Sequence, residues 1–145
     1  QGLRPGLVEL SSLALLAALE PGSGDHLLVN WDEGYASLVL ARNGWPLLVR
    51  TLTEAAAAPE SLRREVANTL LYYQERLGGS GLAGASVRSA RIPAADAVAV
   101  LEEPLGRSPI VLDPWAAFGG GDPEAGQLLA SALAAVGRGV ARRAA

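Results

Sequence analysis

The chain has no cysteine and no lysine, and all 12 of its basic residues are arginine. Without cysteine there can be no disulfide framework, thiolate nucleophile or cysteine-ligated metal. Without lysine, the lysine-dependent phosphate loop of nucleotide hydrolases and Schiff-base chemistry are both excluded. Methionine is missing too, and the sequence opens with Gln1-Gly2, so we expect a segment cut from a longer chain.

Charge and hydropathy restrict the partners. The net charge of −3 supplies no basic field for nucleic acid. The arginine pairs at 63–64 and 142–143 are typical of solvated helix faces. The longest apolar stretch, residues 7–19, contains Glu9 and falls short of the roughly 20 residues that a bilayer span needs. We therefore interpret it as a buried helix without membrane insertion, and residues 1–145 as a single domain.

Residues 26–52 predict three consecutive short strands. An apolar run ends at Asp32-Glu33-Gly34, which is typical of a turn, and a second apolar run begins at Tyr35. Asn43-Gly44 then separates two apolar runs, and both residue types tolerate positive φ, so this pair predicts a two-residue hairpin turn. The third strand begins at Trp45.

Alternating helices and strands follow the meander. A helix over 60–77 is indicated by apolar residues at steps of four and three, with Gly78-Gly79 at its end: Leu62, Val66, Leu70, Tyr73 and Leu77. A short strand is expected over 85–88. Pro93 opens the next helix, with Val98, Leu101 and Leu105 facing inward, and Pro104 should end it within a residue or two.

The remaining part predicts one strand and one helix. Residues 109–112 indicate a short buried strand. Asp122-Pro123-Glu124 is typical of a helix start, and the inner face of this closing helix should consist of Leu129, Leu133, Val136 and Val140. The complete order predicts an α/β fold of the ribonuclease H type: a mixed five-stranded sheet, with a three-strand meander and helices on both faces.

The order and spacing of several segments resemble the second lobe of the PilM family, the actin-like proteins of type IV pilus and type II secretion assembly. The matching segments cover nearly the whole chain: residues 2–19, 27–40, 65–73, 101–114 and 128–139. The resemblance implies an actin-like lobe, a cytoplasmic location peripheral to the inner membrane, and protein partners in a pilus or secretion platform.

Two positions depart from the nucleotide motifs of that family. Where the family has an Asp-x-Gly phosphate loop, this chain has Asn30-Trp31-Asp32, and Asp32 should set a negative charge against phosphate. Where the family has a Gly-Gly pair beneath adenosine, the chain has Ser89-Ala90, whose side chains obstruct close approach. We therefore expect no nucleotide cofactor and no catalysis.

Other candidate residues favour structural roles. Asp32 and Glu33 before Gly34 are ordinary turn residues, although they could form a metal-binding or general-base pair. A two-metal nuclease would need converging carboxylates, for which only Asp32, Asp113 and Glu65 are candidates. His26, the single histidine, is expected at a solvent-facing strand edge. The glycines at 119–121 lack the strand-then-helix phosphate pattern and suggest a flexible loop.

The aromatic residues offer a candidate partner surface. Trp31, Trp45 and Trp115 are expected in core or rim packing, but Trp31 could also plug the phosphate pocket. With Tyr35, it could form the centre of a protein-binding face. The leading hypothesis is a non-catalytic assembly module. The alternatives are half of an ATP-binding actin-like or sugar-kinase-like cleft, and an interaction domain of unrelated function on the same fold.

Overall fold

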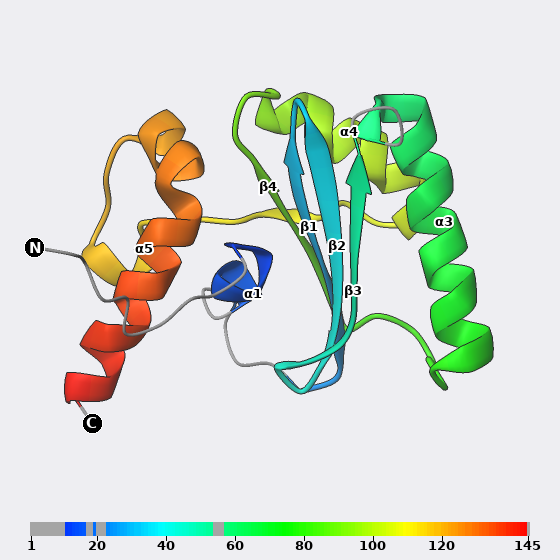
Figure 1. The fold of residues 1–145 in the computed structure, drawn as a ribbon, viewed down its shortest axis with the longest axis horizontal. Coiled ribbons are helices and arrows are strands. Elements are labelled where there is room, and N and C mark those ends of the chain that lie inside the picture. Colours follow the sequence, from blue (N-terminus) through cyan, green and yellow to red (C-terminus); the bar gives the residue numbers. More distant parts are fainter. Residues whose placement is uncertain (1–10, 17–18, 20–22, 54–56, 145) are drawn as a thin grey trace, which may run out of the picture.

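A computed structural model describes residues 11–16, 19, 23–53 and 57–144. Its centre is a five-stranded sheet in the order β3-β2-β1-β4-β5. Figure 1 shows β3, β2, β1 and β4 side by side. The strands are β1 (Asp25–Asp32), β2 (Tyr35–Arg42), β3 (Trp45–Thr53), β4 (Gly84–Ser89) and β5 (Ile110–Val111). The first three strands form an antiparallel meander, whereas β4 runs parallel to β1, and β5 parallel to β4. The predicted mixed sheet is confirmed.

Two-residue turns join the strands of the meander. The turn between β2 and β3 consists of Asn43 and Gly44, with φ angles of 52° and 81°. Positive φ at both positions matches the twist of the flanking strands, which confirms the predicted hairpin. Glu33 and Gly34 form the turn between β1 and β2.

Helices cover both faces of the sheet. The helices α3 (Pro59–Arg76) and α4 (Ala94–Leu105) lie on one face, and α1 (Ser11–Leu16) and α5 (Pro123–Ala144) lie on the other (Figure 1). Because successive side chains of a strand point to opposite faces, Leu27 and Val29 pack toward α3 and α4, and Leu28 packs toward α1 and α5.

The helix predictions agree with the structure at several positions. Leu62, Val66 and Tyr73 are buried on α3, and α4 ends at Leu105, one residue after Pro104. The predicted buried helix over 7–19 is seen as α1, with Leu15 fully buried. Residues 7–10 and 17–18 lie outside the described part of the chain.

The predicted inner face of α5 is wrong at two of its positions, whereas Leu133 is partly buried. Leu129 and Val136 are about half exposed, and the residues that pack into the core are Ala130 and Ala134. Alanine lets the helix axis approach α1 and the sheet closely, so the larger residues are turned outward. The burial of Val140 lies outside what the structure describes.

Two edge positions also differ from expectation. Trp45 is not core or rim packing, because 78% of its surface is exposed at the start of edge strand β3. The strand predicted to be buried over 109–112 is instead the opposite edge strand β5, and both Ile110 and Val111 are exposed. The buried residues of this segment are Pro109 and Leu112, which flank the strand on either side.

A cluster of hydrogen-bonded polar side chains lies at the amino end of β1. Asp25 accepts hydrogen bonds from Nε and Nη2 of Arg42 at 2.8 and 2.7 Å, and from the hydroxyl of Tyr73 at 2.6 Å. The guanidinium of Arg42 holds the pKa of Asp25 below its usual range. Burial and the nearby carboxylate raise the pKa of Tyr73. These contacts join the base of the β1–β2 hairpin to α3.

Candidate functional site

The candidate site lies at the carboxyl ends of the parallel strands β1 and β4. From β1 the chain turns toward β2, and from β4 it turns toward β5, so the connections diverge on opposite sides of these two neighbours. Open α/β sheets bind their ligands in the crevice at such a switch point. The four positions predicted as altered nucleotide-binding residues meet here: Asn30, Asp32, Ser89 and Ala90.

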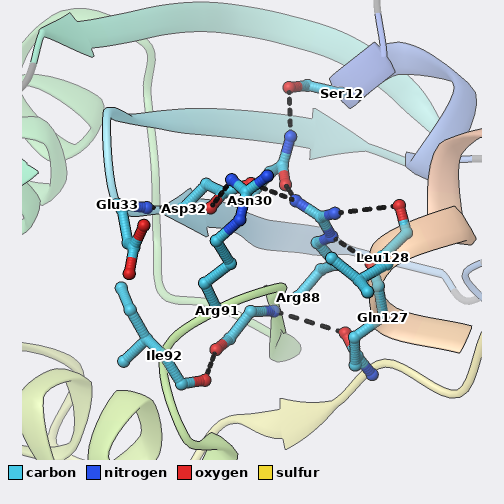
Figure 2. A network of polar contacts seen from close by, with 10 residues as sticks. Ser12, Asn30, Asp32, Glu33, Arg88, Arg91, Ile92, Gln127 and Leu128 are labelled. Atoms are coloured by element: carbon cyan, nitrogen blue, oxygen red, sulfur yellow. Dashed lines mark hydrogen bonds and ion pairs between the residues drawn. The ribbon is translucent and has the colours of Figure 1, made fainter. Parts of the chain in front are cut away.

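Arg88 occupies the centre of this site. Its side chain is only 6% exposed and points toward α5 (Figure 2). Nε donates to the carbonyl of Gln127 at 2.8 Å, and Nη1 donates to Oδ1 of Asn30 at 3.0 Å. Nη2 lies 3.5 Å from the carbonyl of Leu128. The guanidinium therefore ties β4 to β1 and to the first turns of α5.

Asp32 is paired with two arginines. Its carboxylate accepts a hydrogen bond from Nη1 of Arg91 at 3.0 Å and lies 3.7 Å from Nη1 of Arg88. It also accepts the backbone N–H of Glu33 at 2.9 Å, which agrees with the turn interpretation. The two arginines offset the charge of Asp32, and the expectation that Asp32 opposes phosphate stays a prediction.

Two amides complete the network. Gln127 donates from Nε2 to the carbonyl of Leu112 at 2.7 Å and accepts the backbone N–H of Ser89 at 3.3 Å. It thereby bridges the ends of two parallel strands. On the other side, Nδ2 of Asn30 donates to Oγ of Ser12 on α1 at 3.0 Å (Figure 2). The buried polar groups at this switch point are satisfied by the protein itself.

Trp31 is not an exposed partner anchor. Only 2% of its surface is accessible, it belongs to the core beneath α3 and α4, and its indole N–H donates to the carbonyl of Ala57 at 2.9 Å. The alternation of side chains along β1 explains this, since Asn30 and Asp32 point to the opposite face. Tyr35 is partly exposed at the start of β2, opposite Asp32, and its proposed role in binding stays a prediction.

Ser89 and Ala90 form the turn that leads from β4 toward α4. The Ser89 hydroxyl donates to the carbonyl of Ile92, so it is used within the turn. The N–H of Ala90 lies 3.4 Å from the carbonyl of Trp31, which fixes the turn against the end of β1. The expectation that these side chains exclude adenosine stays a prediction.

A cavity of about 310 Å³ lies beside this network, between the loop after β5 and the start of α5. Trp115 forms part of its wall, and its indole N–H donates to the carbonyl of Asp122 at 2.7 Å. A Cβ atom at Gly126 would lie 2.5 Å from this ring nitrogen, so glycine permits the close approach. Trp115 thus packs on the loop, as expected.

The described residues contain no group of three or more His, Asp or Glu side chains that could hold a metal ion. Glu65 pairs with Arg50 on the α3 side of the sheet, whereas Asp113 accepts the N–H of Trp115 at 2.9 Å. These carboxylates do not converge with Asp32 as a two-metal nuclease requires.

His26 lies near the opposite end of β1 from Asp32. One ring nitrogen is 3.0 Å from Oγ of Ser86, and partial burial lowers the pKa of the imidazole. This contact fits a structural role, but the prediction of a solvent-facing strand edge is wrong, because β1 lies inside the sheet between β2 and β4.

Sequence reasoning missed Arg88 and Gln127 as site residues. Only their residue types could have indicated a role. Arg88 is an arginine within a predicted strand, and Gln127 is a glutamine in an otherwise apolar helix turn. Their importance depends on the register that sets Asn30 opposite Arg88, and on the approach of α5 to the strand ends. Neither relationship follows from residue spacing.

Comparison with solved structures identifies the fold. The chain superposes on a PilM-PilN type IV pilus biogenesis complex with a TM-score of 0.70 and 20% identity, covering 96% of this chain and 54% of that one. Ethanolamine utilization protein EutJ from Carboxydothermus hydrogenoformans matches with a TM-score of 0.50 and 14% identity, over 86% and 52% of the two chains. The chain therefore has the fold of an actin-like lobe and spans about half the length of these proteins.

The sequence comparisons are negative. No protein-family model matches the chain, and no curated protein sequence matches it.

Proposed function

We propose that this lobe is a non-catalytic assembly module that works as PilM does, in the cytoplasmic part of a type IV pilus or type II secretion platform. The observation that carries the proposal is the internal network at the switch point. Arg88, Asn30 and Asp32 satisfy one another at the position where a ligand would bind in an open α/β sheet. A ligand entering there would have to displace buried, paired charges, which is costly.

The structural likeness supports a partner class. The solved PilM structure is a complex with PilN, and we infer that the present lobe likewise binds a protein of the assembly platform. In the described part of the chain, no helix is both long and apolar enough to cross a bilayer. A location at the cytoplasmic side of the inner membrane, reached through protein partners, is part of the proposal.

Two measurements test this function. In titration calorimetry with ATP and magnesium at millimolar concentration, we expect no saturable heat, and a micromolar dissociation constant would contradict the proposal. In size-exclusion chromatography with the purified PilN-type protein of the same organism, we expect a complex. Separate elution of the two proteins at tens of micromolar would argue for an unrelated interaction domain on the same fold.

The alternative is half of an ATP-binding cleft, and one observation favours it. Arg91 is more than half exposed and supplies positive charge beyond what Asp32 neutralises, so the rim could attract an anion. The variant Arg91→Ala distinguishes the two hypotheses. If ATP binds the original chain and does not bind this variant, the hypothesis of an ATP-binding cleft replaces that of a non-catalytic assembly module.

A further inference from the structure

Strand β3 leaves one long edge of the sheet open. It has nine residues and pairs with β2, while its outer edge pairs with no other strand among residues 11–16, 19, 23–53 and 57–144. The opposite edge strand, β5, has only two residues. Natural proteins commonly shorten or guard edge strands, because free N–H and C=O groups template pairing with another chain.

The features of β3 that discourage pairing with another strand lie only at its first residues. Pro46 lies there, and the irregularity in pairing with β2 lies between Leu40 and Ala41, which is also at that end. Residues 47–53 contain neither proline nor glycine. Their one charged side chain, Arg50, is turned toward α3 and held by Glu65. Most of the strand is therefore open to pairing.

A groove of about 350 Å³ runs between this strand and α3. Leu48 and Arg50 line it from β3, and Asn68, Thr69 and Tyr72 line it from α3. An edge strand beside a helix is the geometry in which domains that bind peptides by strand addition hold an extended segment.

The opposite face of β3 is also apolar and accessible. Leu47 and Val49 are 38% and 40% exposed. Since side chains alternate along a strand, a segment paired with β3 would direct one set into the groove and the other set over Leu47 and Val49.

The charge of the groove decides what kind of segment fits. Arg50 donates to Glu65 and, through Nη1, to Oγ1 of Thr69 at 3.2 Å. The groove thus presents a compensated ion pair and no free charge, and burying an unpaired charge against it would be unfavourable. The matching occupant carries uncharged side chains.

From this geometry we propose that β3 and α3 dock an extended, uncharged segment of another polypeptide, which adds to the sheet as a sixth strand. Main-chain hydrogen bonds to the edge of β3 provide the attachment, and the β3–α3 groove selects the alternate apolar side chains. This surface is distinct from the switch-point network, so the proposal stands or falls independently of nucleotide binding.

The test uses a fluorescein-labelled, end-blocked heptapeptide of alternating threonine and valine, with fluorescence anisotropy as the readout. Val49→Lys introduces a charge on β3, and Val111→Lys introduces the same charge at a valine of similar exposure, 37%, on β5. We expect saturable binding to the original chain, at least tenfold weaker binding to Val49→Lys, and binding within twofold for Val111→Lys. Equal loss in both variants, or no saturation at millimolar peptide, would overturn the proposal.

A second measurement leaves the protein unchanged. The same peptide, N-methylated at every residue, cannot donate the hydrogen bonds of a strand from either edge, and we expect its binding to fall at least tenfold. Undiminished binding would refute strand addition. Sedimentation of the original chain tests the rival occupant: a dimer abolished by Val49→Lys would show that a second copy, rather than another polypeptide, occupies this edge. A monomer supports the proposal.

Discussion

The carboxylate of Asp32 and the guanidinium of Arg88 lie 3.7 Å apart in the interior, each at the carboxyl end of its own parallel strand. The pairing of β1 with β4 sets these ends side by side, and Arg88 continues to the carbonyls of α5. The pair therefore joins two strands and a helix at the switch point. Its main consequence is for stability, because removing one member leaves the other charge buried.

Asp32→Ala should lower the free energy of unfolding by about 3 kcal/mol, since Arg88 loses its nearest counter-charge in a buried setting. Urea denaturation followed by tryptophan fluorescence measures this. Glu33→Ala is the matched control, because the neighbouring acid is exposed and should cost less than about 0.5 kcal/mol. Equal effects of the two substitutions would show that the ion pair contributes nothing specific.

The meander could be predicted from sequence because its determinants are local. Asn43-Gly44 marks a turn by its own backbone preferences, and the apolar runs on either side have no competing interpretation. The number and order of strands followed from such signals. The resemblance to PilM, confirmed as a likeness of fold, rested on the order of these same segments.

Which face of each helix or strand is buried was less predictable, because burial depends on packing between segments that are distant in the sequence. In α5 the leucines suggested an inner face, yet Ala130 and Ala134 pack inward, since the closeness of α1 decides which residues fit. In β1 the residue spacing could not show which face of the sheet would receive Trp31. Trp31 is therefore not the exposed centre of the predicted partner surface, while the role of Tyr35 stays a prediction. The buried role of Arg88 was missed for the same reason.

Trp31 and Trp45 should respond oppositely to truncation. Trp31→Ala removes a buried ring and leaves the carbonyl of Ala57 without its donor, so we expect a loss of about 3–5 kcal/mol in unfolding free energy. Trp45→Ala removes a ring that is mostly exposed and should change stability by less than about 0.5 kcal/mol. Chemical denaturation of both variants, followed by far-ultraviolet circular dichroism, provides the comparison. Similar losses would contradict the assignment of the two rings.

The cluster around Asp25 should make stability sensitive to acid. Because Arg42 depresses the pKa of Asp25 in the folded state, the stabilisation is complete above the unfolded pKa of about 4 and is lost as the pH falls through the folded pKa. Asp25→Asn should therefore be less stable at pH 7 and should lose less stability between pH 4 and pH 2 than the original chain.

Thermal unfolding at half-unit steps of pH measures this dependence. Glu75→Gln, on an exposed part of α3, is the control and should reproduce the pH profile of the original chain. If Asp25→Asn also reproduces that profile, with a parallel decline below pH 4, the carboxylate does not carry the acid sensitivity.

Gly44→Val tests the hairpin that fixes the register of β2 and β3. At a φ of 81°, a β-branched residue is strained even though the space around the position is open, so the variant should be destabilised by about 1–3 kcal/mol. Gly34→Val is the matched control. It lies in the other two-residue turn of the same meander, with equally open surroundings but without a positive φ, and should lose less than about 1 kcal/mol. Equilibrium unfolding in urea measures both variants. Because both add the same side chain to an exposed turn, a difference between them reports the backbone strain at Gly44, and an equal loss would remove the basis for the assigned turn.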